Sequence, residues 1–578
     1  MNTESYQKEL NNLRELAVEF SEKHPALAPQ LSGPSPDPDV ERILEGVAFL
    51  TGNIRQKLDD DFPEFAQSLM QMIFPHYLQP LPSSTIIEFT PKSILKSSLV
   101  IPKGTFVDSV EVEGTSCRFQ TCQDINIAPV NITDVNVEEK GVGKRIIELD
   151  INLNSMDMQT WAKDGIDFYI GGDYVGASDV FLLLQHYLTS IDIVVDNSNK
   201  VIQLSADKLE ALGFDEEQKL IPFPKNGFPA FRTLQEFFLF KEKFLFVRLK
   251  GLEAIAKASQ LTIKFNLDKV NFKMPVINKQ RFTLHASPSI NLFEHDAEPI
   301  KLTGRQSEIR IIPKKGRGRS VKEHFDIHSI QSVEGNNRRA NSRTVYNSIS
   351  GFYSGGSSTP VYQTSVHSGE KGEAGDTYLT LHYPAQMEIK TNETLSIKMT
   401  CSNADLPSQL RPGDINRATS TTSELVEFSN ILPPTDSLKV PVGGSLIWRL
   451  LSHLSLNFLS LANKENLQAL LSLYIFPGST AKKEETINRK KIAGISTVDI
   501  KSADRMVNGN LLRGQEILIE LDRDAYSSRG DMILFATMLE SLFNSYATFN
   551  CFTQVTMKES NTGESYSWPA RLGDRPLI

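Results

Sequence analysis

The chain has 578 residues, of which 40% are hydrophobic and 23% are charged, and its net charge is −9 with a pI near 5.7. This length exceeds what one hydrophobic core can organise, so we expect about three or four domains, and the apolar fraction excludes global disorder. The acidic balance gives no general reason to bind nucleic acid or an anionic membrane surface.

The first 83 residues are predicted to be mainly helical. An apolar face over 10–20 is followed by the turn-rich GPSPDPD (33–39), after which Asp37 can cap a second helix. That second helix has the clearest stripe, in which apolar side chains recur every three or four residues: Val40, Ile43, Leu44, Val47, Leu50, Ile54 and Leu58. A third stripe covers 62–73 and ends at Pro75.

Three amphipathic helices in so short a segment can hardly cover all their apolar faces on one another. We therefore predict that the stripe over 40–58 is a partner interface, docking on another domain or on a partner chain. The alternative is that it packs internally on the neighbouring helices.

From residue 84 to about 400 the sequence pattern changes to short runs of β-branched and aromatic residues, separated by turns that contain Gly and Pro. Helical insertions are predicted at 178–190 and 232–240. The runs predict two β-rich, sandwich-like or barrel-like domains, 84–280 and 281–440. Within the second, residues 333–375 are rich in Gly, Ser, Asn and Arg and are predicted to form a long flexible loop. The runs are TIIEFT, SLVIP, TFVDSV, CRFQT, RIIELDINL, LTIKFNL, TYLTLHY and TLSIKMT.

The last segment, 441–578, contains both helical apolar stripes and short strand-like runs, and it is predicted to be an α+β module. Apolar stripes indicate helices over 446–461 and 532–546, and strands are predicted for KKIAGISTV, EILIEL and TFNCFTQVTM. The fold class expected for the whole chain is therefore multi-domain α+β, with a helical N-terminal segment, β-rich middle modules and an α+β C-terminal module.

Cysteine usage and the N-terminus bear on the compartment. Cys117 and Cys122 could pair in a hairpin, but thiols in a reducing compartment are expected. The first twenty residues lack a basic segment followed by an apolar core, so no signal peptide is predicted. Residues 445–461 carry Arg449 and His453, which favours a buried helix over a membrane span. A cytosolic chain is predicted. The cysteines are Cys117, Cys122, Cys401 and Cys551.

Metal binding is not predicted. His324 and His328 in HFDIH have the four-residue spacing of a metal-binding helix but no glutamate between them. The surrounding FDIHSIQSV alternates like a strand, in which positions four apart are separated by about 13 Å. Cys117 and Cys122 have no second thiol pair near them in sequence.

Phosphate binding and catalysis find equally little support. KGVGKR (140–145) lacks the phosphate-loop spacing and is interpreted as a hairpin turn, and KKGRGR (314–319) as a solvated loop. Glu294, Asp296 and Glu298 in EHDAEP are a conceivable acid/base group, although such clusters are usually solvated. No catalytic residue, cofactor or metal is therefore expected.

Several sequence blocks resemble, in order, the landmarks of the TssF family (also called VasA or ImpG), a baseplate subunit of the type VI secretion system. The first is HPALAPQLSGPSPDPDVERILEGVAFLTGNIRQKLDDDFPEF (24–65), and the last is WPARLGDRPLI (568–578). Between them lie MIFPHYLQPLPS (72–83), IPKGT (101–105), CRFQT (117–121), NLFEHDAEPI (291–300) and HSIQSVEG (328–335).

The resemblance implies a structural role. TssF-like proteins are similar to the wedge proteins of contractile phage tails. Two copies join one TssG in a wedge, TssK binds it, and wedges surround the VgrG spike hub. The assembled baseplate nucleates the contractile sheath, with TssE as a further partner, and docks on the membrane complex at the cytosolic face of the inner membrane.

One segment departs from the family pattern. SGGSSTPVYQTSVHSGEKGEAGD (354–376) replaces a more aromatic, arginine-bearing stretch, so contacts of that stretch are not carried over. Two alternative functions are a cytosolic hydrolase acting through Glu294, Asp296 and Glu298, and a β-rich binding protein of another kind.

Overall fold

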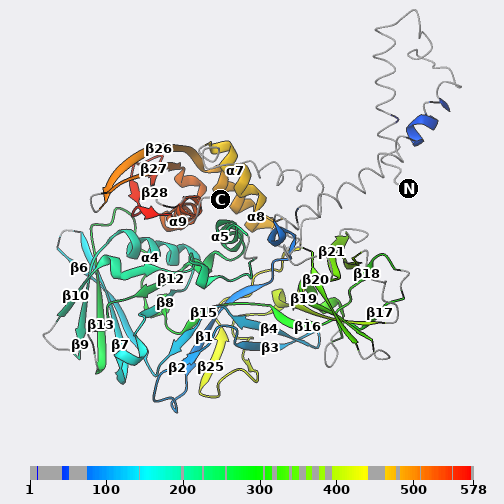
Figure 1. Ribbon diagram of the computed structural model, residues 1–578. Coiled ribbons are helices and arrows are strands. Elements are labelled where there is room, and N and C mark those ends of the chain that lie inside the picture. Colours follow the sequence, from blue (N-terminus) through cyan, green and yellow to red (C-terminus); the bar gives the residue numbers. More distant parts are fainter. Residues whose placement is uncertain are drawn as a thin grey trace, which may run out of the picture. The chain divides into compact units, whose positions relative to one another are not determined.

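The chain divides into two compact units in the computed structural model shown in Figure 1. One unit comprises Met1–Ile73 with Val442–Ser452, and the other Phe74–Pro441 with His453–Ile578. In the first unit the structure describes residues 10, 42–43, 45–50 and 70; in the second it describes residues 74–141, 143–196, 201–223, 227–253, 255, 257–303, 306–315, 322–337, 342–349, 359–367, 376–384, 393–439, 463–476, 482–507, 510–547, 549 and 551–573.

In the first unit, residues 10, 42–43, 45–50 and 70 are helical. The helix predicted over 40–58 is thus confirmed at 42–43 and 45–50. The rest of that helix lies outside the described residues, as does the helix predicted over 446–461.

The centre of the second unit is an antiparallel sheet with the strand order β24-β3-β4-β15-β1-β25. Strand β1, which lies between β15 and the edge strand β25, is buried along most of its length and pairs with strands about 200 and 340 positions later in the chain. The strands are β1 (Ser84–Pro91), β3 (Phe106–Val112), β4 (Thr115–Thr121), β15 (Ala286–Ile290), β24 (Arg417–Ala418) and β25 (Val426–Asn430).

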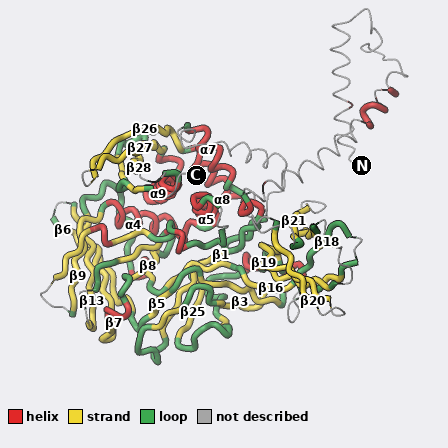
Figure 2. The backbone as a smooth tube through the Cα atoms, viewed as in Figure 1, coloured by secondary structure: helices red, strands yellow, loops and turns green. Residues whose placement is uncertain are grey.

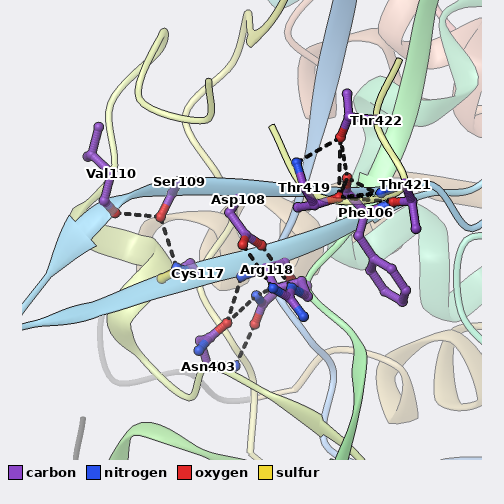
Figure 3. Close-up of polar contacts among 11 residues, drawn as sticks. Phe106, Asp108, Ser109, Val110, Cys117, Arg118, Asn403, Thr419, Thr421 and Thr422 are labelled. Atoms are coloured by element: carbon purple, nitrogen blue, oxygen red, sulfur yellow. Dashed lines mark hydrogen bonds and ion pairs between the residues drawn. The ribbon is translucent and has the colours of Figure 1, made fainter. Parts of the chain in front are cut away.

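Side-chain hydrogen bonds join distant segments to the β3–β4 edge of this sheet (Figure 3). Thr419 and Thr422 donate to the carbonyl of Phe106 over 2.7 and 3.0 Å, and the amide of Arg118 donates to Asn403 Oδ1 over 3.0 Å. The predicted boundary between residues 280 and 281 passes through this sheet, because β15, β24 and β25 follow it and β1, β3 and β4 precede it. The division of the chain into four domains stays a prediction.

Two further antiparallel sheets follow β5 in the chain. One has the order β10-β9-β13-β7-β6 and the other β11-β12-β8-β14. Lys140 pairs with Lys144 across the β6–β7 connection, so the hairpin predicted for KGVGKR is confirmed. The strands are β6 (Asn131–Lys140), β7 (Lys144–Asp157), β8 (Ile166–Ile170), β9 (Leu188–Val195), β10 (Val201–Ser205), β11 (Leu209–Ala211), β12 (Phe246–Leu249), β13 (Lys257–Leu267) and β14 (Phe282–Thr283), and β2 (Leu99–Ile101) pairs separately with β5 (Ile125–Ile127).

The helical insertions predicted between these strands are confirmed with shifted ends. They are α4 (Tyr174–His186) and α5 (Pro229–Leu239), and the short α3 (Met158–Trp161) precedes them. Asp173 caps α4 by accepting a hydrogen bond from the Gly176 amide, and Pro229 occupies the first turn of α5, where no amide donor is required.

The fourth sheet has the order β16-β23-β19-β20-β21-β22-β18, and β17 also pairs with β23. It corrects the prediction of a continuous loop over 333–375, because the end of β19 and all of β20 and β21 lie there. SRTVYNS and VYQTSVH show no strict alternation of apolar and polar residues and carry few large aliphatic side chains, so their strand signal was weak. The strands are β16 (Phe293–Asp296), β17 (Ile300–Lys301), β18 (Ile309–Arg310), β19 (Asp326–Asn337), β20 (Ser342–Ser348), β21 (Val361–His367), β22 (Asp376–His382) and β23 (Thr394–Ser402).

The C-terminal module is a sheet of order β26-β27-β28-β29, with β30 on β28, and its long helix α9 connects the parallel strands β27 and β28. Helix α9 contacts α4 and α5, and Figure 2 shows these helices gathered beside that sheet. The helix predicted over 532–546 is confirmed, but residues 490–493 of the predicted strand KKIAGISTV end a helix instead. The elements are α7 (Lys464–Leu473), α8 (Lys482–Ala493), β26 (Ile495–Val507), β27 (Asn510–Leu521), α9 (Arg529–Ser545), β28 (Phe552–Glu559), β29 (Ser565–Ser567) and β30 (Arg571–Leu572).

Candidate assembly interface

The described part of the predicted interface is a helical, apolar surface in contact with solvent. Ile43, Val47 and Leu50 lie on one helix face by their spacing, and their exposed fractions are 66%, 40% and 62%. Ala48, on the opposite side of the same turn, is fully buried. Among the described residues, these three apolar side chains are therefore largely exposed to solvent. The other predicted interface residues, Val40, Leu44, Ile54 and Leu58, lie outside the described residues.

The carboxylates considered for catalysis lie along an edge. Glu294 and Asp296 are exposed on β16, the end strand of its sheet, and Glu298 follows it half-buried. Between them, the His295 ring bonds the carbonyl of Lys314 over 2.7 Å. These side chains are held by strand geometry at a solvated edge.

The two histidines of HFDIH do not converge. His324 is in a short 3-10 turn, Lys322–His324, where its Nδ1 bonds Thr115 Oγ1 over 2.8 Å, while His328 is buried in β19. The strand interpretation is confirmed. Across the residues that the structure describes, no group of three or more His, Cys, Asp or Glu side chains is placed to hold a metal ion.

The remaining sequence features considered for function are the basic run KKGRGR and the four thiols. Residues 316–319 of KKGRGR lie outside the described residues. All four cysteines are thiols; Cys117, Cys122 and Cys401 are buried, and burial raises the pKa of Cys117 and Cys122 to about 12. None of the described helices has the length and apolarity needed to cross a membrane.

Sequence reasoning missed a buried ionic cluster between α5 and the turn that follows it. Glu236 accepts from the Lys243 ammonium and, through Oε1, from the amides of Leu220 and Ile221 at 2.8 and 3.0 Å. The Lys243 ammonium also donates to the Gly213 carbonyl over 2.8 Å. Because the hydrogen-bond partners of Glu236 among the described residues are parts of the fold itself, this cluster orders the loops that it joins.

Comparison with known proteins identifies the family. The sequence model for "Type VI secretion system, TssF" matches residues 2–575. The chain belongs to the TssF family. The resemblance noted from the ordered sequence blocks is thereby confirmed.

Relatives of known name or structure agree with this membership. The type VI secretion system component TssF1 of Pseudomonas aeruginosa is 26% identical over 627 aligned positions, which cover 100% of this chain and 99% of the relative. A chain in the cryo-electron microscopy structure of the TssK-TssF-TssG baseplate subcomplex is 28% identical, with a TM-score of 0.78 and coverage of 93% of this chain and 99% of that one. A chain of the type VI baseplate complex has a TM-score of 0.62 at 23% identity, with full coverage of both, and shows the same fold. The expected β-rich, multi-domain α+β fold class is confirmed.

Proposed function

We propose that this TssF-family chain is a structural, non-catalytic wedge subunit of a type VI secretion baseplate, and that it assembles with TssG and TssK. The observation that carries the proposal is the end-to-end likeness to a chain solved within a TssK-TssF-TssG subcomplex. A likeness that covers every module transfers the assembly role better than a shared single domain would. The baseplate then acts in the cytoplasm, docked at the inner membrane, with the VgrG hub, TssE and the sheath as further partners.

The N-terminal stripe is the proposed contact with TssG or a second copy. Its support is the solvent exposure of Ile43, Val47 and Leu50, because an exposed row of large apolar side chains on one helix face is costly unless a partner covers it. The predicted members Val40, Leu44, Ile54 and Leu58 extend the same stripe by helical spacing.

Co-expression with TssG and TssK, followed by native mass spectrometry of the purified complex, tests the assembly role. The wild-type chain is expected in a stable complex of defined stoichiometry. A wild-type chain that purifies as a monomer despite abundant soluble TssG and TssK would overturn the proposal.

The interface is tested separately with Ile43→Asp and Leu50→Asp. Each places a charge in the proposed contact, so loss of TssG co-purification is expected while the isolated chain stays folded. Val276→Asp is the matched control, because Val276 is 74% exposed and lies between β13 and β14, far along the sequence. Retention of TssG by both N-terminal variants would exclude this stripe as the contact.

A further inference from the structure

One face of the C-terminal sheet continues past the end of the helix that covers it. On β27, Ile517, Ile519 and Leu521 are buried and share a face, and on β28 Val555 and Met557 are buried on the equivalent face. Helix α9 packs against β28 and ends at Ser545. Thr553 fixes that end by donating to Asn544 Oδ1 over 3.1 Å. The pairing of β26 with β27 continues towards their turn beyond Gly514, the residue opposite the start of β28.

The strand register arranges the uncovered side chains of this face in three rows. Ser502 pairs with Gln515, which pairs with Thr553; Asp504 pairs with Arg513; and Met506 pairs with Leu511. Each row is two residues further from α9 than the last, so the rows share a face. The surface changes with distance from the helix from neutral polar, through charged, to apolar.

A cavity of about 480 Å³ opens over the first two rows, between the sheet and the end of α9. Tyr546 and Ala547 line its helix side and Cys551 its strand side. Gln515 Oε1 is buried and accepts no hydrogen bond from any residue that the structure describes. A buried carbonyl oxygen without a donor is costly, so a rotation of the Gln515 amide that turns Oε1 into the cavity would let it accept from an external N–H or O–H group.

The outer row is an exposed apolar rim. Met506, Leu511 and Phe549 are 70%, 60% and 58% exposed. Phe549 lies three residues before the start of β28 and forms a bridge with Gly573, so Met506 and Leu511 make up the row itself. Large apolar side chains grouped beside a polar recess are typical of a protein-binding surface.

The middle row supplies charges of both signs. Asp504 and Arg513 face each other across the ladder, and neither forms an ion pair with any residue that the structure describes. A partner that carries a basic group opposite Asp504 and an acidic group opposite Arg513 would complement both charges.

From this arrangement we infer that the groove formed by Ser502, Asp504, Met506, Leu511, Arg513 and Gln515 binds an extended peptide segment of a partner protein. The segment places a large apolar side chain on the rim, a basic and an acidic side chain on the charged row, and an N–H group on Gln515 Oε1. A peptide fits better than a second globular copy, because globular partners bury roughly 800 Å² a side whereas a segment fills a recess with few residues. The inference rests on the proposed function for the source of the segment, a baseplate subunit.

The groove is tested with overlapping synthetic peptides that tile TssG and TssK, measured by fluorescence anisotropy against the purified full chain. At least one peptide with the stated chemistry is expected to bind, and its affinity should fall about tenfold or more with Leu511→Asp and with Arg513→Glu. Val345→Asp is the matched control, because Val345 is 52% exposed on β20 in another sheet. Failure of all peptides, or equal binding by Leu511→Asp, overturns the inference.

Charge exchange gives a second, independent readout. In the double variant Asp504→Arg with Arg513→Asp, the native peptide should bind weakly, and a peptide with its basic and acidic residues exchanged should regain affinity. Both positions are exposed, so the double variant is expected to fold. Equal binding of both peptides would mean that the charged row does not contact the segment, which also overturns the inference.

The native thiol reports occupancy inside the assembled complex. Cys551 is the partly exposed cysteine and lines the groove, whereas the other three are buried. Its alkylation by iodoacetamide should slow about fivefold or more when TssG and TssK are bound. If the complex forms but alkylation stays fast, the inference fails and the assembly role stands; if no complex forms, the assembly role fails. Concentration-dependent dimers that Leu511→Asp abolishes would instead assign the groove to a second copy.

Discussion

Lys491 and Asp531 form a buried ion pair that fastens α8 to the first turn of α9. The ammonium nitrogen lies 2.6 Å from Asp531 Oδ1, and the two side chains are 1% and 0% exposed. The Tyr174 hydroxyl at the start of α4 donates to the same oxygen over 2.6 Å. Burial alone would raise the pKa of Asp531, but the Lys491 ammonium and the donated hydrogen bonds hold it below its ordinary value. One carboxylate therefore joins three helices from two modules.

Removing the cation alone should destabilise the C-terminal module strongly. Lys491→Met leaves the Asp531 carboxylate buried without its counter-charge, which typically costs about 3–5 kcal/mol. The expected result is a large fall in the midpoint of urea unfolding, followed by circular dichroism.

The double variant Lys491→Met with Asp531→Asn separates charge from packing. It removes both charges and keeps an acceptor for Tyr174, so it should be more stable than Lys491→Met alone. Arg489→Met is the matched control, because its pair with Glu485 is mostly exposed and contributes about 0–1 kcal/mol. A double variant less stable than the single would contradict the assignment of the cost to an uncompensated charge.

Gly530 allows the closest approach between α9 and α4. A Cβ atom built on it would lie 2.0 Å from the carbonyl oxygen of Ser178, and its amide donates to Asp179 Oδ1 over 2.8 Å. Gly530→Ala should therefore push the helices apart and destabilise the module by at least about 1–3 kcal/mol, as overpacking does. Thermal unfolding by circular dichroism checks this.

Gly46→Ala serves as its control, since the residue is helical and no described atom outside its own helical turn lies within 4 Å of the added carbon. That variant should be neutral or slightly more stable, because alanine favours helix over glycine by about 1 kcal/mol. Equal effects of the two substitutions would show that helix propensity rather than the α4–α9 approach decides the outcome.

Local sequence pattern predicted those elements whose signal is local. The apolar stripe over 532–546 and the hairpin at 140–145 required no knowledge of distant residues, and both were confirmed. Helix α8 was missed because KKEETINRKKIA has no apolar stripe. It forms with acidic residues in its first turn and basic residues in its last, and with Lys491 buried against a carboxylate 40 positions away.

Pairings between distant segments could not be predicted for a related reason. Strand β1 pairs with β15 and β25, and its side chains Ile86, Ile87 and Phe89 are buried. No turn in the sequence specifies these partners, because they lie far along the chain. The groove at the end of α9 was likewise hidden. Its rows become neighbours only through the register of three strands. The sequence alone shows that Asp504 and Met506, which are two positions apart, share one face of a strand.

Acid should destabilise the second unit through its buried histidines. His76 is 2% exposed among aromatic rings that include Phe223, Phe231 and Tyr474, and neither ring nitrogen has a hydrogen-bond partner in the described part of the chain. Burial lowers the pKa of His76 to about 3, from an ordinary value of 6.5. Between these two values the unfolded chain binds the proton and the folded chain does not, so stability is complete above pH 6.5 and falls as the pH drops towards 3.

His76→Phe should remove this contribution. Its stability should equal or exceed that of the wild type at pH 7, because the phenyl ring fills the site without unsatisfied nitrogens. The difference should grow in favour of the variant by up to about 1.4 kcal/mol per pH unit below 6.5. Urea unfolding at pH 7, 6 and 5 measures it, with the exposed His382→Phe as control. Parallel pH profiles for His76→Phe and the wild type would mean that His76 already shares a proton or a water molecule in the folded state, so that its burial costs nothing in acid.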